Sequence, residues 1–328
     1  MIRPAARVSY LAAAAVLLTL ASASASDAFN EGDEAPVATK SPTKSRLLPI
    51  PPLPAGPPPS GALPKGLADV AIAVRDLPIG ARMKAVTDPL LGVPYKLDGL
   101  GEGDGWDPDP LARYDAFDCI GFVEEALALA MAGDPVHAAD VRNRLRYGAG
   151  PIDYAHRRHF MELQWIPGNV ADGFVVDTTA KYGATMHMER EITPDTWKRW
   201  HKRSAFHLTD DELPNGTMKL DVLPLATALT AVAALPDGAI VLTVRKDVGT
   251  PVWISHTGFV VHDAEGHVMQ RNASRRAGMS VIDEDLATYV HHLQTYTKWP
   301  SAGIAILEPV DPWPRRSALS STPSKGTQ

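Results

Sequence analysis

Cysteine is the rarest residue in this chain: its 328 residues include one, Cys119. A single cysteine cannot form a disulfide within the chain, so no internal bridge stabilises the fold. Exported proteins usually carry cysteines in pairs, and an unpaired one is either a buried, inert thiol or a functional group. The surroundings of Cys119 decide between these two interpretations.

Other signatures are missing as well. Neither a His-Glu-x-x-His motif nor a cysteine-rich spacing is present for zinc, and residues 104–109 lack the spacing of a calcium-binding EF-hand. The chain has no glycine-rich phosphate loop and no dinucleotide fingerprint. Its net charge of −6 provides no basic field for nucleic acid. We therefore expect no metal, no organic cofactor and no nucleic-acid partner.

No apolar run reaches the 18 residues typical of a membrane span. Residues 1–26 instead have the form of a signal peptide: Arg3 and Arg7, an apolar stretch from Tyr10 to Leu20, and small residues up to Ser26. We predict that the protein is exported to the periplasm or the extracellular envelope. We also predict that it has no stable membrane anchor after signal removal.

Composition divides the rest of the chain into three parts. Residues 27–66 are rich in proline and poor in aromatics, which predicts a disordered linker. Residues 314–328 are rich in Ser, Thr and Lys, which predicts a disordered tail. Residues 67–313 remain as one domain, long enough for a sizeable core.

Helical spacing of apolar residues dominates the first part of this domain, and strand-like segments gather in the second part. The expected helices are Leu67–Met83, Phe117–Ala132, Pro135–Arg146, Leu220–Leu235 and Asp283–Leu293. The expected strands are Ala239–Val244, Trp253–His262, Val268–Arg271 and Gly303–Leu307, with a hairpin turn at Ala264–Gly266. Helices followed by an antiparallel sheet indicate an α+β fold.

The segment around Cys119 has the features of a helix start. Asp118 is suited to cap a helix whose first residue is Cys119, and Gly133 is suited to end it. Unpaired N–H groups and the positive end of the helix dipole favour a thiolate there. We therefore predict that Cys119 is a nucleophile. Glu124 and Glu125, one turn further on, are expected to support the helix or to pair with an arginine.

A thiolate nucleophile needs a base and a group that orients the base. Among the 11 histidines, His256 is the strongest candidate because it opens an apolar strand that also contains Gly258. A tight hairpin brings Asn272, at the end of the next strand, beside His256. The carbonyl oxygen of Asn272 can fix the imidazole tautomer. Gln270 and Ser274 are alternatives for this third position.

A basic turn contains Arg157, Arg158 and His159. The planar fork of an arginine suits carboxylates, so we expect these residues to bind the substrate's carboxylates. The alternative is a solvated basic turn without a ligand.

Short motifs between residues 80 and 308 resemble two related groups of cell-wall enzymes. The sequence Asp118-Cys119-Ile120-Gly121-Phe122 is similar to the Asp-Cys-Ser-Gly-Phe motif of NlpC/P60 peptidases. Together with Val123-Glu124 it is closer still to the N-acetylmuramoyl-L-alanine amidase-like family, formerly a domain of unknown function. The resemblance extends to Leu91–Tyr95, Arg157–Phe160 with Trp165-Ile166, His256–Phe259 and Asn272–Ser274.

This resemblance implies a papain-like fold of the NlpC/P60 type. N-terminal helices, with the catalytic cysteine at a helix start, would pack on an antiparallel β-sheet or partial barrel. The resemblance implies Cys119 as nucleophile, His256 as general base, Asn272 as orienting group and Tyr95 as a residue lining the site. Asn272 departs from the commoner histidine, and the insertion at 101–107 is expected to reshape the cleft.

We therefore predict an exported cysteine-dependent hydrolase that cleaves an amide bond of peptidoglycan stem peptides and takes muropeptides as substrates. Two bonds remain open: the lactyl–L-alanine amide and the γ-D-glutamyl–diamino acid bond. The alternatives are a papain-like thiol acyltransferase or protease with another envelope substrate, and a catalytically silent wall-binding module.

Overall fold

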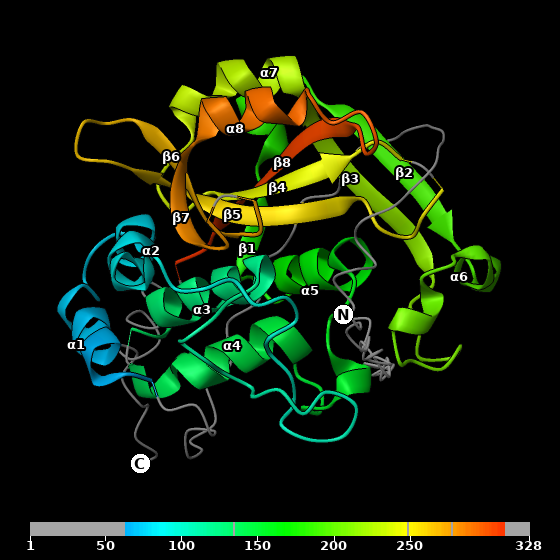
Figure 1. Ribbon diagram of the computed structural model, residues 1–328, viewed down its shortest axis with the longest axis horizontal. Helices are drawn as coiled ribbons and strands as arrows, with labels where there is room; N and C mark the ends of the chain where they lie inside the picture. Colours follow the sequence, from blue (N-terminus) through cyan, green and yellow to red (C-terminus); the bar gives the residue numbers. More distant parts are fainter. Residues whose placement is uncertain (1–62, 134, 248, 277, 312–328) are drawn as a thin grey trace, which may run out of the picture.

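The computed structural model describes residues 63–133, 135–247, 249–276 and 278–311. The predicted signal peptide, most of the predicted linker and the predicted tail at 314–328 lie outside the described residues. The described part is an antiparallel sheet between two layers of helices (Figure 1), which confirms the expected α+β class. No helix within the four described ranges is long and apolar enough to cross a membrane.

The sheet contains eight strands within the described residues, and all paired strands run antiparallel. Their order is β2-β3-β8-β4-β5-β6-β7, and β1 pairs with β8 off this path. The predicted strands correspond to β4, β5, β6 and β8, which together form the centre of the sheet. The bounds are β1 (Val175–Asp177), β2 (Met186–Ile192), β3 (Gly216–Pro224), β4 (Ile240–Arg245), β5 (Ile254–His262), β6 (Val268–Ser274), β7 (Ser280–Asp285) and β8 (Ser301–Pro309).

Helices cover both faces of the sheet (Figure 1). One face packs against α7 and α8 around a smaller core, and the other packs against the layer that contains α3 around the larger core. The bounds are α1 (Lys65–Ala73), α2 (Ile79–Thr87), α3 (Cys119–Ala132), α4 (Ala138–Tyr147), α5 (Ile166–Ala171), α6 (Pro194–Arg199), α7 (Leu225–Ala231) and α8 (Leu286–Leu293).

Helix α3 is the central helix of the larger layer, packed against α2, α4, β5 and β6. It begins at Cys119 because the Asp118 carboxylate accepts the Gly121 N–H at 2.7 Å. It ends at Gly133, whose φ of 60° is the left-handed conformation that glycine adopts without strain. The predicted helix start and stop are therefore confirmed.

Three predicted helices differ from the observed elements. The expected helix Leu67–Met83 is two helices, α1 and α2, because the chain turns at residues 74–76 and Pro78 occupies the N-cap position of α2. The expected helix Leu220–Leu235 begins as β3, whose residues alternate between buried and exposed, and becomes α7 only after Pro224. The first residues of the expected helix Asp283–Leu293 belong to β7, and α8 starts at Leu286.

Candidate active site

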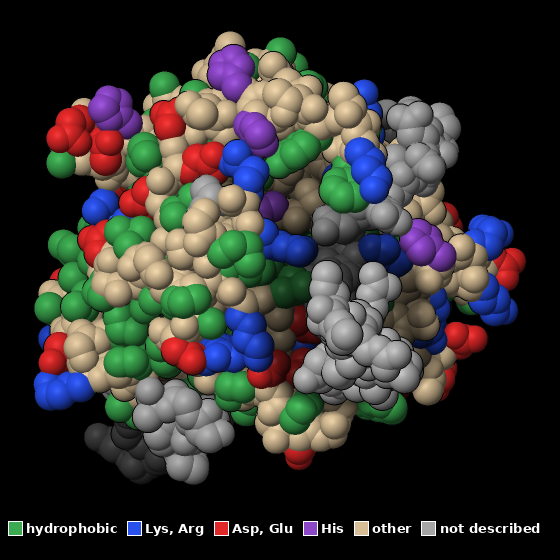
Figure 2. Space-filling model, in the orientation of Figure 1, with side chains coloured by type: hydrophobic (Ala, Val, Ile, Leu, Met, Phe, Trp, Pro, Cys, Tyr) green, Lys and Arg blue, Asp and Glu red, His purple; other side chains and the backbone are tan. Residues whose placement is uncertain are grey.

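A cavity of about 330 Å³ lies where the start of α3 meets β4, β5 and α8, and both Cys119 and His256 line it. This volume lies in the usual range for small-molecule sites. On the face shown in Figure 2, the surface is hollowed near its centre, and Lys and Arg side chains gather around the hollow. The nucleophile and base candidates, 137 positions apart in the sequence, thus line the same cavity.

Cys119 keeps a partly exposed surface at this cavity. The protein packed around it removes most of its water, and this burial, together with the negative charge of Asp118, raises the pKa of the thiol to about 12. Backbone N–H groups of Thr257, Ile120 and Cys119 itself oppose this rise in pKa. The N–H groups at the helix start therefore favour the thiolate, as expected, but burial has the larger effect on the pKa of the thiol.

His256 is held by Asn272 from the neighbouring strand. The imidazole Nε2 and the amide Oδ1 of Asn272 are 3.0 Å apart, and Asn272 Nδ2 donates to the Gln270 carbonyl oxygen at 3.2 Å. This second bond fixes the orientation of the amide, so its oxygen faces the imidazole. Nε2 must then carry the hydrogen in the neutral ring, and Nδ1 is left free to accept a proton.

Gly258 makes this contact possible. Asn272 lies across from it in the β5–β6 hairpin, whose register pairs Phe259 with Arg271. A Cβ at position 258 would lie 2.8 Å from the Asn272 Cβ and 2.7 Å from the Arg271 carbonyl oxygen. Only a residue without a side chain lets Asn272 approach this closely and reach His256.

The imidazole is neutral at physiological pH. Burial, with a smaller contribution from the positive charge of Arg276, lowers the pKa of His256 to about 4, although the bond to Asn272 opposes this change. No hydrogen bond joins the thiol to the imidazole within the described part of the chain. The Thr257 N–H, in the peptide group directly after His256, is nevertheless near enough to lower the pKa of the thiol. Hydrogen bonds between catalytic groups often tighten only when the substrate binds.

Tyr95 lies beside the thiol. It is joined to Phe117, two residues before Cys119, by an isolated parallel bridge, and it lines the cavity. Burial, followed by the negative charges that Cys119 and Asp118 can carry, raises the pKa of its hydroxyl far above the usual range. Tyr95 therefore stays a neutral hydrogen-bonding group in the wall of the site.

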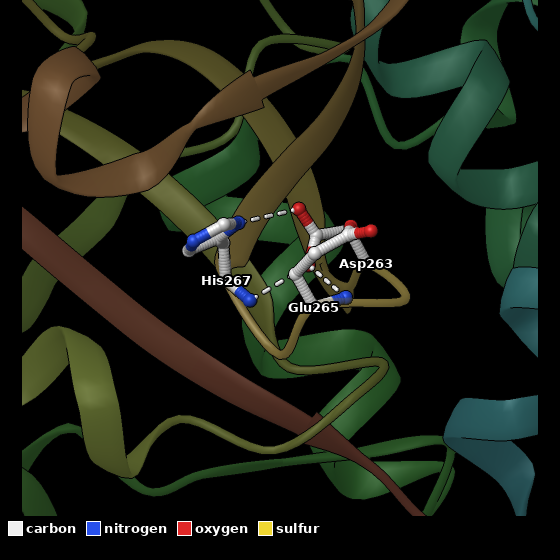
Figure 3. Close-up of side chains that lie close together, drawn as sticks. All are labelled: Asp263, Glu265 and His267. Atoms are coloured by element: carbon white, nitrogen blue, oxygen red, sulfur yellow. Dashed lines mark hydrogen bonds and ion pairs between the residues drawn. The ribbon is translucent and has the colours of Figure 1, made fainter.

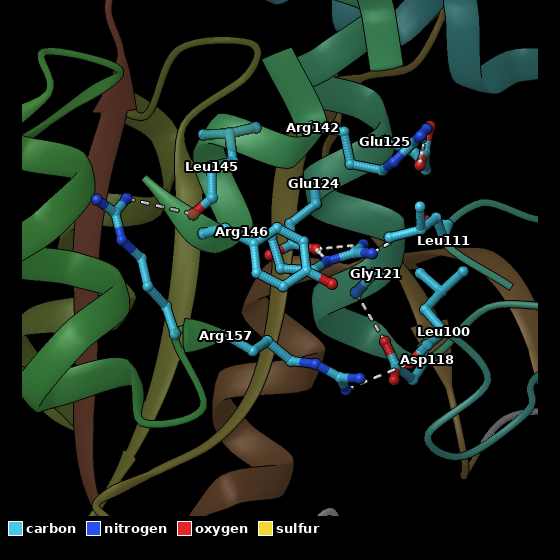
Figure 4. A network of polar contacts seen from close by, with 12 residues as sticks. Leu100, Leu111, Asp118, Gly121, Glu124, Glu125, Arg142, Leu145, Arg146 and Arg157 are labelled. Carbon is cyan, nitrogen blue, oxygen red and sulfur yellow. Dashed lines mark hydrogen bonds and ion pairs between the residues drawn. The ribbon is translucent and has the colours of Figure 1, made fainter. Parts of the chain in front are cut away.

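Arg157 lines the cavity, but its guanidinium is bonded within the protein. It contacts both carboxylate oxygens of Glu102 at 2.8 and 2.7 Å, the Asp107 carboxylate at 2.6 Å and the Leu100 carbonyl oxygen at 3.3 Å. Figure 4 shows Arg157 and Leu100 beside Asp118 at the start of α3. Arg157 thus anchors the inserted segment 101–107 to the wall of the cavity.

Arg158 and His159 are also bonded within the protein. Arg158 contacts the Asp172 carboxylate and the Asn169 side-chain oxygen, each at 2.7 Å. His159 Nε2 lies 2.6 Å from the Tyr154 carbonyl oxygen, and burial lowers the pKa of its imidazole to about 3. The structure brings all three residues of the basic turn to the cavity, and their binding of substrate carboxylates stays a prediction.

Two buried ion pairs lie behind Cys119 on α3. Glu124 accepts from Arg146 at 2.6 Å, and Glu125 accepts from Arg142 at 2.9 Å (Figure 4). This confirms the expectation that these glutamates pair with arginines. Both arginines belong to α4, so the two pairs hold α4 against the helix that carries the thiol.

Sequence reasoning missed a group of cavity residues from β4, α8 and the segment before β8: Arg245, Tyr289 and Trp299. The Tyr289 hydroxyl is 2.6 Å from the Thr243 hydroxyl, and its ring centre lies 6.1 Å from that of His256. A signal was present for Arg245, because it is the charged last residue of an otherwise apolar strand. Tyr289 and Trp299 carry no comparable signal.

One group of possible metal ligands occurs among the described residues, at the turn between β5 and β6. Asp263, Glu265 and His267 converge there (Figure 3). The Asp263 carboxylate accepts the N–H groups of Glu265 and His267 and contacts the His267 ring at 2.8 Å. These bonds stabilise the turn, and they explain why the three side chains lie together. None of the three residues lines the cavity.

Residues 85–296 match the N-acetylmuramoyl-L-alanine amidase-like family, also described as AmiA-like. The chain belongs to this family. The match spans the nucleophile candidate, the basic turn, the β5–β6 hairpin and α8. The resemblance of the short motifs to the amidase-like family is therefore confirmed.

Solved structures of similar fold fit this assignment. A Legionella pneumophila protein of the DUF1460 family is 21% identical, with a TM-score of 0.65, and the match covers 75% of this chain and 94% of that one. A Bacteroides uniformis N-acetylmuramoyl-L-alanine amidase is 22% identical, with a TM-score of 0.57, covering 71% of this chain and 99% of that one. At these identities the likeness concerns the fold. No curated protein matches the chain significantly.

Proposed function

We propose that this amidase-like chain hydrolyses an amide bond of peptidoglycan stem peptides, with Cys119 as nucleophile, His256 as general base and Asn272 as the group that orients the base. The observation that carries the proposal is the hydrogen bond between Asn272 and His256, because His256 lines the cavity that also contains the thiol at the start of α3. A cysteine on a helix and a His–Asn pair on adjoining strands make up a papain-like arrangement.

The reaction begins from a neutral thiol and a neutral imidazole, because both groups are buried. As Sγ attacks the amide carbonyl carbon, Nδ1 of His256 takes the thiol proton. The imidazolium then gives this proton to the leaving nitrogen, the C–N bond breaks, and a thioester remains on Cys119. Water attacks the thioester, loses a proton to His256 and releases the acid and the thiol.

The start of α3 supplies the donors for the oxyanion. The Gly121 and Phe122 N–H groups bond to the side chain and the carbonyl of Asp118. The N–H groups of Cys119 and Ile120 are not bonded to Asp118 and lie near the thiol. These two groups are therefore the proposed donors to the oxyanion. A donor of this kind contributes about 3–4 kcal/mol to lowering the barrier when it meets a developing negative charge. The same helix start therefore positions the nucleophile and stabilises the tetrahedral intermediate.

Peptidoglycan is the proposed substrate because the family is amidase-like and because a fold neighbour carries the name of a muramoyl-L-alanine amidase. An exported location fits this substrate, and the proposed signal peptide at 1–26 provides the route. The scissile bond is either the lactyl–L-alanine amide or the γ-D-glutamyl–diamino acid bond.

Digestion of purified muropeptides followed by mass spectrometry tests this function. A new free L-alanine amino group identifies the amidase reaction, and a new free amino group on the diamino acid identifies the endopeptidase reaction. Muropeptides that remain intact over a wide range of pH and protein concentration contradict the proposal. Intact muropeptides that nevertheless bind the protein favour a wall-binding module.

A further inference from the structure

Arg245 is the last residue of β4 and lines the same cavity as Cys119 and His256. Only 7% of its surface is exposed. A guanidinium is seldom buried without a charged partner, because removing its water is costly. None of the reaction steps above uses Arg245, so they do not account for its burial at the cavity.

The protein itself does not supply that partner. Within the described residues, no hydrogen bond or ion pair joins the guanidinium to a carboxylate. The guanidinium carbon lies over the Trp299 ring, 5.6 Å from its centre. Glu162 is near enough for its negative charge to raise the pKa of Arg245. Its Oε1, however, accepts the backbone N–H groups of Trp253 and Ile254 at 2.5 and 2.6 Å. Burial raises the pKa of Glu162, and no ion pair within the described residues joins its carboxylate to Arg245.

The other arginines with little exposure at this cavity differ from Arg245. Arg146 is paired with Glu124, Arg157 with Glu102 and Asp107, and Arg158 with Asp172. Arg245 is thus the member of this set whose donors remain available to a ligand. Burial lowers its pKa to about 10, so the guanidinium stays charged at neutral pH.

We propose that Arg245 and the Trp299 ring form a subsite that binds a carboxylate of the stem peptide while the scissile amide lies at Cys119. This inference rests on the proposed function and adds the group by which the site recognises its substrate. A guanidinium binds a carboxylate through two parallel hydrogen bonds, which fixes position as well as charge. The apolar ring beside it shields that contact from water and holds the guanidinium in place.

Stem peptides carry free carboxylates at two residues. A γ-linked glutamyl residue keeps its α-carboxylate free, and the diamino acid that follows it carries carboxylates of its own. Both are groups that cells can convert to amides, which removes the negative charge. The subsite therefore predicts that the enzyme distinguishes amidated stem peptides from unamidated ones.

The test measures binding by isothermal titration calorimetry to Cys119→Ala protein, so that no ligand is consumed. Three synthetic muramoyl tripeptides serve as probes: one with all carboxylates free, one amidated at the γ-linked glutamyl residue, and one amidated at the diamino acid. We expect amidation at one of the two positions to weaken binding about 10- to 100-fold, the range of hydrogen bonds to charged groups. The position that matters identifies the bound carboxylate.

The Arg245→Gln variant should bind the unamidated tripeptide more weakly than the parent does, by the same factor as amidation weakens binding to the parent. It should no longer distinguish the unamidated tripeptide from the amidated one. Arg245→Lys keeps the positive charge but loses the planar fork, so its affinity for the unamidated tripeptide should lie between those of the parent and Arg245→Gln. Arg190→Gln is the matched control, because Arg190 is paired with Asp247 at 2.8 Å and does not line the cavity. It should bind like the parent.

Equal affinity of the parent for all three tripeptides overturns the subsite. This comparison uses only protein with Arg245 intact, so it does not depend on whether the Arg245 variants fold. The proposed function is judged separately, because the active protein must still cut the free tripeptide. A protein that cuts it but ignores amidation refutes the subsite alone. A protein that neither binds nor cuts any of the three refutes both.

Discussion

His256 and Asn272 face each other across the β5–β6 hairpin, with the imidazole Nε2 3.0 Å from the amide oxygen. Because Asn272 also donates to the Gln270 carbonyl oxygen, its amide cannot turn without losing a bond. The contact thus selects the tautomer in which Nδ1 can take a proton. The acid–base part of the proposed mechanism depends on this single relationship.

Replacing the two partners should affect turnover to different degrees. We expect His256→Ala to reduce kcat/KM on muropeptides by at least about 100-fold, the scale of a lost general base. Asn272→Ala should cost less, because the imidazole remains and only its orientation is lost. An equal or greater loss in Asn272→Ala shows that the third position has been misjudged. Unchanged turnover in His256→Ala assigns the base to another residue.

Gly258→Ala should act on the site through Asn272. The added methyl group would lie 2.8 Å from the Asn272 Cβ, so Asn272 must move away from the imidazole. We expect a loss of kcat similar to that of Asn272→Ala, and little further loss when the two substitutions are combined. Gly66→Ala in α1 is the control, because no atom outside its chain neighbours and its own helix backbone lies within 4 Å of the added group. Losses that simply add in the double variant speak against this coupling.

Asp118→Asn should make Cys119 more acidic. The Asp118 charge raises the pKa of the thiol, and asparagine removes that charge while remaining a good helix cap. A lower thiol pKa means more thiolate, so alkylation by iodoacetamide at pH 8 should become faster. Asp118→Ala should speed alkylation as well but lose about 1 kcal/mol of stability with the cap. Slower or unchanged alkylation in Asp118→Asn contradicts this electrostatic interpretation.

The pair of Arg142 and Glu125 should matter for stability. Their side chains are 2% and 0% exposed, and their charged atoms are 2.9 Å apart. Arg142→Met leaves the Glu125 carboxylate buried without its cation, which should cost about 3–5 kcal/mol in urea denaturation. Lys65→Met breaks an exposed pair with Asp69 and should cost less than about 1 kcal/mol. Similar costs for the two variants are incompatible with a buried charge pair.

Local sequence signals predicted the part of the site that depends on neighbouring residues. Asp118 before Cys119 and Gly133 after it determine the bounds of α3, and the hairpin turn at 264–266 brings Asn272 beside His256. These features involve capping and register, which act within a few residues or across one turn.

Features that depend on distant partners could not be predicted in the same way. The sequence predicted that Arg157 and Arg158 bind carboxylates of the substrate. In the structure their carboxylate partners come from the inserted segment and from the residue after α5. Arg245 matters because it has no such partner, and a sequence cannot show that. The pKa of Cys119 likewise depends on how much water the whole fold removes.

The most direct test of the account is to compare the parent protein with Cys119→Ala on purified muropeptides by mass spectrometry. The account predicts that the parent releases one defined pair of products, and that Cys119→Ala releases none while keeping its circular dichroism spectrum and its affinity for the peptide. Products formed by Cys119→Ala at the parent's rate would show that the only sulfhydryl of the chain is not the nucleophile.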